Sequence, residues 1–185
     1  MSMLYYIHGY QSTPHGEKAA LFKKTLHAIA ISYQDTAPEE IRIQHCLEKI
    51  SKKIRNDPSV TLIGSSLGGF LATSTAMSHP NVGRLILLNP AIIPPETDLD
   101  TIEGMPLRIL QEMINPSLFT QKITAQITIL RGTQDTVVPD LWVFRFAQAQ
   151  NATIQFLDDD HRFSKNLSRL PDIISELLQK EEQNR

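Results

Sequence analysis

One serine in the chain lies in a pattern that favours a nucleophile. Ser66 is the middle residue of Gly64-Ser65-Ser66-Leu67-Gly68, a G-x-S-x-G sequence between the apolar run VTLI and the helix-like run FLATSTAM. A strand–turn–helix of this kind exposes the serine hydroxyl, and the small flanking residues allow neighbouring elements to approach closely. Because a serine hydroxyl is a weak nucleophile until a base takes its proton, the pattern predicts a carboxylate and a histidine further along the chain.

Both partners are present, and each directly follows a strand-like run. Asp135 comes after AQITIL, and His161 comes after ATIQF. Since the loops after parallel strands open at one edge of a sheet, we expect these side chains to meet Ser66 there. We interpret the three residues as a catalytic set in which Ser66 attacks, His161 accepts its proton and Asp135 orients the imidazole. The alternative is a glycine-rich turn with a serine that does no chemistry.

The opening sequence MLYYIHGYQ offers a candidate oxyanion hole. The tetrahedral intermediate of acyl transfer needs backbone N–H donors that are fixed in advance. We expect one donor from Leu67 and the other from Tyr10, with Gln11 as the neighbour that could take its place. Gly9 gives the backbone freedom to turn at this point. His8 could be a second base, but we favour a structural role because it precedes the serine, whereas the G-x-S-x-G pattern places the base last.

Three aspartates, Asp158, Asp159 and Asp160, directly precede His161. If these carboxylates face the cleft, their charge favours the protonated imidazole and disfavours substrates with an anionic leaving group. The other interpretation is a solvated acidic turn with no effect on the chemistry. The sequence does not decide between the two.

Composition and charge exclude several classes of protein. The 185 residues are 41% hydrophobic and 21% charged, with a net charge of −2 and no basic stripe interleaved with aromatics, which argues against a nucleic-acid partner. The longest apolar runs fall short of the roughly 18–20 residues that span a membrane, and the start lacks the features of a signal peptide. We therefore expect a cytoplasmic protein that acts on a small molecule; the oligomeric state is not indicated.

The sole cysteine, Cys46, rules out an internal disulfide, as is usual in reducing compartments. It lies in the helix-like run IRIQHCLEKISKKI, where we expect a small packed side chain. His45 stands beside it, but a structural zinc site needs about four ligands and no second cluster accompanies this pair. We therefore expect no metal site, and nothing in the sequence requires a cofactor.

Strand and helix signals alternate from end to end, which predicts a sheet of about six mostly parallel strands flanked by helices. The expected strands are 4–7, 31–34, 60–63, 84–88, 126–130 and 153–156. The expected helices are 17–30, 38–55, 67–79, 141–150 and 166–179, before a polar tail at 180–185. We expect a single domain over residues 1–185.

Residues 90–122 interrupt this alternation and are rich in proline, which predicts a short lid-like insertion over the strand ends. Its apolar residues either line an acyl pocket or anchor the insertion to the body. We favour the anchor for most of them, because a stripe of Met and Leu usually belongs to a core. They are Met105, Leu107, Ile109, Leu110, Met113, Ile114, Leu118 and Phe119.

The segments YIHG, IGSSLGG, LILLNPA and DHRF resemble the α/β-hydrolase superfamily, and most closely the small bacterial YqiA-like esterases. The resemblance covers nearly the whole chain and implies a compact α/β-hydrolase fold with a Ser–His–Asp triad. It implies hydrolysis of carboxylic esters or acyl thioesters through an acyl-enzyme on Ser66. The chain departs from the family pattern at Asp158 and Asp159, where small residues are usual. The alternative function is a non-catalytic ligand-binding or regulatory protein with the same fold.

Overall fold

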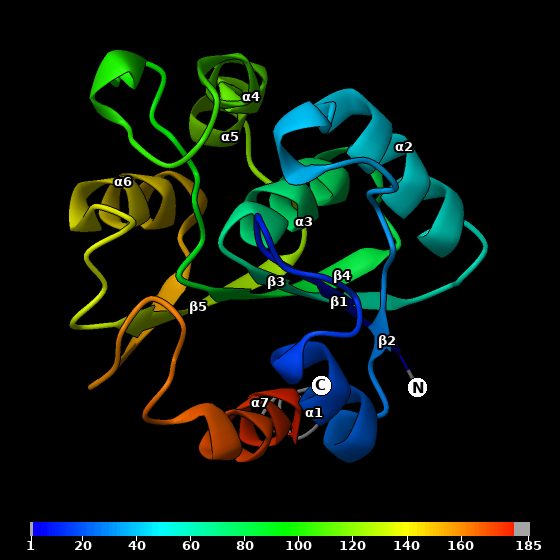
Figure 1. The fold of residues 1–185 in the computed structure, drawn as a ribbon. Helices are drawn as coiled ribbons and strands as arrows, with labels where there is room; N and C mark the ends of the chain where they lie inside the picture. The colour runs from blue at the N-terminus through cyan, green and yellow to red at the C-terminus, as the bar shows by residue number, and fades with distance from the viewer. Residues whose placement is uncertain (1, 180–185) are drawn as a thin grey trace.

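The computed structural model describes residues 2–179, so the predicted tail at 180–185 lies outside the described part. Within this range six parallel strands form one sheet in the order β2-β1-β3-β4-β5-β6 (Figure 1). The strands are β1 (Met3–Ile7), β2 (Ile29–Ala30), β3 (Val60–Ser65), β4 (Val82–Leu88), β5 (Gln126–Gly132) and β6 (Thr153–Leu157). The prediction of a six-stranded parallel sheet flanked by helices is confirmed.

Helices cover both faces of the sheet (Figure 1). One face carries α2 (Ile43–Ile54), α3 (Leu67–Ser78), α4 (Leu107–Met113), α5 (Ser117–Thr120) and α6 (Asp140–Gln150). The other face carries α1 (Glu17–Leu26) and α7 (Leu170–Gln179), and short 3₁₀ helices lie at Pro38–Glu40, Leu99–Thr101 and Leu167–Arg169. Because both faces are covered, the central strand β3 is buried along its whole length. None of the described helices is long and apolar enough to cross a membrane.

Each face of the sheet has its own apolar cluster. Helix α2 buries one side, because its apolar residues Ile43, Cys46, Ile50 and Ile54 recur at helical spacing. On the opposite face, Phe22 of α1 packs in the second cluster. Cys46 is therefore the packed side chain that the sequence predicted.

The strand register aligns the carboxyl ends of the strands. Gly64, near the end of β3, pairs with Ile7 on one side and Leu87 on the other. At the far side of the sheet, Gly132 pairs with Leu157, so β5 and β6 also end together. The loops that follow β1, β3, β4, β5 and β6 consequently open at one edge, where the candidate site residues were expected.

The chain around β2 differs from the prediction. Helix α1 ends at Leu26 because His27 adopts a left-handed conformation with φ 55°, so the helix is shorter than 17–30. The strand lies at Ile29–Ala30 rather than at the predicted 31–34. Beyond it the chain leaves the sheet edge, since the hydroxyl of buried Tyr33 hydrogen-bonds the loop after β1.

The helix predicted at 38–55 is split in two. Pro38–Glu40 forms a 3₁₀ turn, and the extended conformation of Ile41 (ψ 148°) ends it. Helix α2 then starts at Ile43, whose backbone N–H donates to the Glu112 carboxylate at 2.8 Å. A side chain of α4 therefore satisfies one of the free N–H groups at the start of α2.

The insertion at 90–122 is anchored to the body. Arg108 of α4 donates to the carbonyl oxygens of Ile41 (3.0 Å) and Glu39 (3.1 Å), across from the insertion. Of its eight apolar residues, Leu107 is exposed and three are half-buried. Four are buried in the main apolar cluster, namely Ile109, Leu110, Met113 and Leu118. The three half-buried residues pack against the same cluster, so seven of the eight fit the anchor interpretation, which we favoured for most of the set.

Candidate active site

Ser66 occupies a sharp turn between β3 and α3. Its backbone has φ 53° and ψ −119°, a strained conformation that costs on the order of 1–3 kcal/mol. Backbone packing around the turn leaves no room for larger residues at two glycines. A Cβ on Gly68 would lie 2.1 Å from the carbonyl oxygen of Ile7, and one on Gly64 would lie 2.4 Å from that of Gly68. The turn leaves Ser66 half-buried at the strand end, whereas Ser65 is buried.

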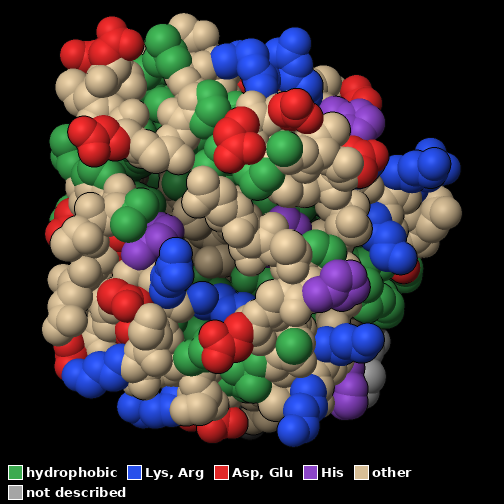
Figure 2. All heavy atoms as spheres, in the orientation of Figure 1, with side chains coloured by type: hydrophobic (Ala, Val, Ile, Leu, Met, Phe, Trp, Pro, Cys, Tyr) green, Lys and Arg blue, Asp and Glu red, His purple; other side chains and the backbone are tan. Residues whose placement is uncertain are grey.

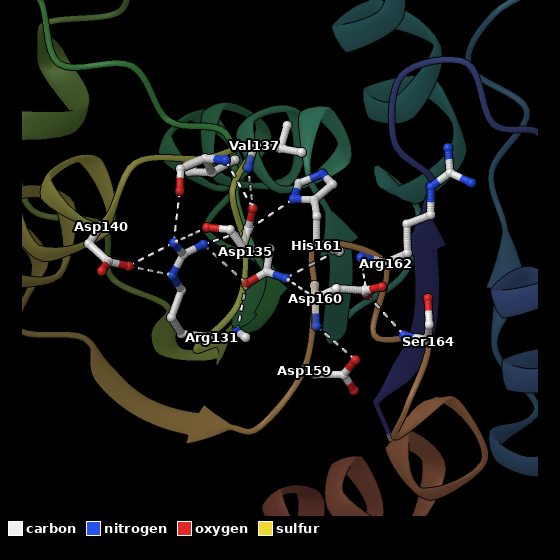
Figure 3. Close-up of polar contacts among 12 residues, drawn as sticks. Arg131, Asp135, Val137, Asp140, Asp159, Asp160, His161, Arg162 and Ser164 are labelled. Carbon is white, nitrogen blue, oxygen red and sulfur yellow. Dashed lines mark hydrogen bonds and ion pairs between the residues drawn. The ribbon is translucent and has the colours of Figure 1, made fainter.

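The loops after β5 and β6 bring Asp135 and His161 together (Figure 3). Nδ1 of His161 lies 2.9 Å from Oδ2 of Asp135. The Asp135 side chain is fully buried, and its other oxygen accepts the backbone N–H groups of Val137 (2.8 Å) and Val138 (3.0 Å). A carboxylate at Nδ1 favours the tautomer with its proton on that nitrogen, which leaves Nε2 as a proton acceptor.

The Asp135 carboxylate is held in its ionised form. Burial acts to raise its pKa, but the hydrogen bond and charge of His161 and the N–H groups of Val138 and Val137 outweigh burial. The pKa of Asp135 therefore lies below its ordinary value. An ionised acid here stabilises an imidazolium at His161.

A buried arginine binds the same carboxylate. Arg131, at the end of β5, is only 1% exposed, and its Nη1 lies 2.5 Å from Oδ2 of Asp135. Its Nη2 and Nε both contact Oδ1 of Asp140, at 2.7 and 2.9 Å, and Nη2 also donates to the carbonyl of Val138 (2.7 Å). Figure 3 shows the guanidinium between the two aspartates. A buried cation needs such partners, so Arg131 and Asp135 stabilise each other.

Asn89 links the serine turn to the histidine loop. It is fully buried directly after β4, with φ 43°. Its Oδ1 accepts the N–H of Gly132 at 2.8 Å, and its Nδ2 donates to the carbonyls of Asp160 and His161, both at 3.1 Å. The chain around Asn89 also hydrogen-bonds the backbone N–H and C=O of Ser66, at 3.0 and 3.1 Å. One short segment therefore holds both the serine and the histidine.

The hydrogen bonds of the described residues include Asp135–His161 but none between Ser66 Oγ and His161 Nε2. Catalytic hydrogen bonds are often long before a substrate binds and shorten in the complex. The structure thus joins the acid to the histidine and holds the serine at the same sheet edge.

The two candidate oxyanion donors lie on the loops that flank Ser66. A Cβ on Gly9 would lie 3.3 Å from the Cβ of Ser66, so the loop after β1 rests directly on the serine turn. Tyr10 and Gln11 follow, and Gln11 has φ 55°. Leu67 is the first residue of α3, where N–H groups lack intrahelical partners. Within the described residues, neither the Tyr10 nor the Leu67 N–H donates a hydrogen bond, so both are available to an oxyanion.

The acidic run before His161 organises the loop backbone. Asp159 is 1% exposed, and its Oδ1 accepts the N–H groups of Asp160 and Lys165. Its Oδ2 accepts both the backbone N–H and the side-chain amide of Asn166, at 2.7 and 2.9 Å. In Figure 3 the Asp159 carboxylate points away from the His161 ring. Asp159 therefore lies neither in the cleft nor in solvent, contrary to both interpretations of the sequence.

The other two aspartates of the run differ from Asp159. Oδ1 of Asp160 accepts two further backbone N–H groups of its own loop. Asp158 is exposed and contacts the side chains of Lys165 and Gln134. For Asp158 the solvated interpretation holds.

His8 is a buried structural residue, as expected. It is 0% exposed, and its ring stacks on Tyr33 with centroids 4.3 Å apart and planes at 25°. Burial lowers the pKa of His8, which favours the neutral ring. Among the described residues no group of three or more His, Cys, Asp or Glu side chains is placed to hold a metal ion.

Three residues of the site, Arg131, Asn89 and Tyr33, escaped the sequence reasoning, and the position of a fourth, Asp159, was not foreseen. Arg131 is the last residue but one of β5 and Asn89 directly follows β4, and a polar residue at the end of an apolar run is the signal that could have found them. Asp159 was noted, but its position depends on a contact with Asn166, seven residues later, at the start of the predicted helix 166–179. Tyr33 carried no local signal, since its partner lies 25 residues away.

Two grooves lie beside α2, away from these residues. One of about 380 Å³ runs between α2 and α3, and another of about 550 Å³ is bounded by α2, α3 and the chain after α4. Neither is lined by Ser66, Asp135 or His161. Figure 2 shows a hollow near the middle of the face seen in Figure 1, with histidine and Lys or Arg side chains at its rim.

The parallel sheet and the sharp turn at Ser66 form an α/β-hydrolase fold, which the solved structures described below share. Residues 3–178 match the model of the uncharacterised protein family UPF0227, and the chain belongs to that family. A comparison with curated proteins found no match.

Solved structures share the fold at low sequence identity. Est1E from Butyrivibrio proteoclasticus, with ferulic acid bound, is 18% identical over 97% of this chain and 89% of its own, with a TM-score of 0.79. Mouse α/β hydrolase domain-containing protein 10 is 22% identical over 96% and 89%, with a TM-score of 0.73. An α/β serine hydrolase homologue from Coxiella burnetii is 16% identical over 96% and 86%, with a TM-score of 0.70. At these identities the likeness extends to the fold alone.

Proposed function

We propose that the protein is a serine hydrolase that cleaves carboxylic esters or acyl thioesters through an acyl-enzyme on Ser66. The observation that carries the proposal is the hydrogen bond of 2.9 Å between His161 Nδ1 and the buried, ionised Asp135. This pair lies at the sheet edge where Ser66 occupies its strained turn. A nucleophile, an acid and a base are the parts that acyl transfer requires.

In the first half of the proposed reaction, the Ser66 hydroxyl oxygen forms a bond to the acyl carbon while His161 Nε2 takes its proton. The carbonyl oxygen becomes an oxyanion, which the N–H groups of Tyr10 and Leu67 stabilise. Asp135 stabilises the imidazolium. When the carbonyl reforms, the bond to the alcohol or thiol breaks, and the leaving group takes the proton from His161.

In the second half, water attacks the acyl-enzyme and His161 accepts a proton from it. The second oxyanion collapses, the bond to Ser66 breaks, and the serine oxygen recovers its proton from His161. The products are a carboxylic acid and the free enzyme. Ferulic acid, which is bound to Est1E, is a carboxylic acid, and this supports an acyl substrate for the fold.

The proposal is tested with a fluorophosphonate probe and with p-nitrophenyl esters and acyl-CoA thioesters of graded chain length. Ser66→Ala should abolish both labelling and turnover, because it removes the attacking oxygen. Ser65→Ala is the matched control and should keep both. Asp135→Asn should lower kcat by about 10⁴-fold, since the wrong histidine tautomer then faces the serine.

Two results would count against the proposal. Labelling that survives Ser66→Ala would move the nucleophile elsewhere. A folded wild-type protein with neither labelling nor turnover on the full panel would favour the non-catalytic ligand-binding or regulatory alternative.

A further inference from the structure

Three donors converge on the carbonyl oxygen of Gly9. The Tyr33 hydroxyl and the backbone N–H of Ser12 both donate to it at 3.3 Å. Nδ1 of His8 lies 3.0 Å from the same oxygen. Because a carbonyl oxygen only accepts, this contact assigns the proton of His8 to Nδ1.

Burial keeps both aromatic donors in their donating form. Tyr33 is 0% exposed, and burial raises the pKa of its hydroxyl, so the proton stays in place. Burial also lowers the pKa of His8, which favours the neutral ring, and its buried Nε2 has no hydrogen-bond partner among residues 2–179. The Tyr33 hydroxyl has a single proton, which it shares between the Gly9 carbonyl and the carbonyl of His8 at 3.0 Å. Tyr33 therefore holds the segment of the loop that carries both carbonyls.

The planar peptide between Gly9 and Tyr10 links the direction of the Gly9 carbonyl to that of the Tyr10 N–H. The C=O and N–H groups of one trans peptide point in opposite directions. Since the Gly9 carbonyl is held toward the buried Tyr33 hydroxyl, the trans geometry directs the N–H of Tyr10 away from Tyr33. Gly9 itself lies against Ser66, with 3.3 Å between a built Cβ and the serine Cβ. A donor fixed in direction before the reaction is what an oxyanion hole requires.

We propose that Tyr33 is a positioning residue of the oxyanion hole. Its hydroxyl holds the Gly9 carbonyl inward and so keeps the Tyr10 N–H directed at the oxygen of the reacting acyl group. The inference rests on the proposed hydrolase function. Tyr33 itself touches no substrate, and it acts through one peptide plane.

The test is Tyr33→Phe, which keeps the ring and its stacking on His8 but removes the hydroxyl. The Gly9 carbonyl then keeps only two of its three donors, so the Tyr10 N–H is less well directed. We expect kcat on a p-nitrophenyl ester to fall about 10- to 100-fold, less than the 10²–10³ lost when an oxyanion donor is deleted. KM should stay within about twofold, because the donor acts on the oxyanion rather than on the bound substrate.

Tyr5→Phe is the matched control. Tyr5 lies on β1 and is 3% exposed, and its hydroxyl donates to Asp57 at 2.6 Å, before β3. This variant also loses a hydrogen-bonded hydroxyl, but at the opposite end of the strand, so kcat should remain normal. Rates are expressed per active site titrated with the fluorophosphonate, which removes any loss of folded protein from the comparison.

A second readout reports the oxyanion directly. An alkyl trifluoromethyl ketone forms a tetrahedral adduct with the serine, and its affinity should fall in Tyr33→Phe by the same factor as kcat/KM. If Tyr33→Phe does not fold, the His8 donor is changed instead. His8→Asn keeps an N–H donor near the Gly9 carbonyl and should retain more kcat than His8→Leu, which has none.

The outcomes separate the inference from the function on which it rests. Normal kcat and normal ketone affinity in Tyr33→Phe, with turnover still dependent on Ser66, would overturn the role of Tyr33 alone. For the His8 pair, equal kcat in both variants would show that donors to the Gly9 carbonyl do not govern turnover, and this result would also overturn the inference. A wild type without Ser66-dependent turnover would overturn the proposed function and, with it, the inference.

Discussion

The candidate site has two halves, and a different kind of contact holds the loops of each half in place. The nucleophile half consists of the loops after β1 and β3, where backbone rests on backbone at Gly64 and Gly68 with no space for a side chain. The acid–base half consists of the loops after β5 and β6, where the buried side chains of Arg131 and Asp159 bind the loops. One close backbone approach, at Gly132, also occurs in the acid–base half.

Because different physical forces hold the two halves, they should respond differently to charge and pH. Close backbone packing depends on volume alone, so the contacts at Gly64 and Gly68 should be insensitive to charge and pH. Buried charged groups depend on ionisation and on complete sets of partners, so the acid–base half should respond to both. Asn89 joins the two halves through its amide.

The largest expected effect follows from removing the buried cation. Arg131→Met leaves the Asp135 side chain, which is 0% exposed, without its guanidinium. Breaking a buried pair from one side typically costs about 3–5 kcal/mol, and we expect a loss of that size in the free energy of unfolding in urea. Turnover should fall too, because Asp135 then loses both the positive charge of Arg131, which favours its ionised form, and the hydrogen bond that holds it in place.

Asp140→Asn is the control for that change. The Asp140 side chain is 64% exposed, and its loss leaves the contact between Arg131 and Asp135 intact. The expected cost is below about 1 kcal/mol. Equal losses in Arg131→Met and Asp140→Asn would mean that the arginine stabilises the exposed Asp140 and not the buried Asp135.

A change of volume tests the nucleophile half. In Gly68→Ala the new Cβ would lie 2.1 Å from the Ile7 carbonyl and 2.5 Å from that of His8, so strand β1 must shift. We expect a loss of about 3 kcal/mol, at the upper end of typical overpacking costs, and a melting temperature lower by roughly 6–12 °C. Gly83→Ala meets no atom within 4 Å and should melt near the wild type.

The pH dependence of this loss is informative. A steric clash has no titrating group, so the difference between Gly68→Ala and the wild type should be the same at pH 5 and pH 8. A loss that changes with pH would show that charge also holds the nucleophile half, and the comparison between the halves would fail.

The nucleophile half could be predicted from the sequence because its determinants are neighbours in the chain. The glycines around Ser66 lie within five residues, and the turn they allow is local. The alternation of apolar runs also predicted the six parallel strands, since burial on both faces leaves a clear mark on each strand. Ser66, Asp135 and His161 could be named because each closely follows an apolar run that predicts a strand.

The acid–base half could be predicted only in part, because its contacts span long stretches of sequence. Asn89 donates to a carbonyl 71 residues away, and Arg108 reaches a carbonyl 69 residues away to anchor the insertion. Such pairs leave no periodic signal. The strand β2 was predicted at 31–34 instead of Ile29–Ala30 for the same reason. The hydroxyl of Tyr33 hydrogen-bonds carbonyls 24 and 25 residues earlier, which the local sequence does not indicate.

The smallest of the three effects concerns Asp159. Burial acts to raise its pKa, but hydrogen bonds from the Asn166 amide and from the N–H groups of Lys165, Asn166 and Asp160 outweigh burial. The pKa therefore lies below the ordinary value of 3.8. A lowered pKa in the folded state means that Asp159 contributes stability above pH 3.8, and that this stability is lost as the pH falls through the folded-state pKa.

Asp159→Asn puts an amide donor against backbone N–H groups, so we expect a loss of about 2 kcal/mol at pH 7. The exposed Asp158, changed to Asn, should cost no more than about 0.5 kcal/mol. Urea unfolding of the wild type and both variants at pH 7, 5 and 3 gives the measurement. Because the wild type protonates Asp159 in acid and the variant has nothing to protonate there, the gap between them should narrow at pH 3. A gap that stays constant from pH 7 to 3 would mean that ionisation does not hold this loop, and that the acid–base half depends on shape as the nucleophile half does.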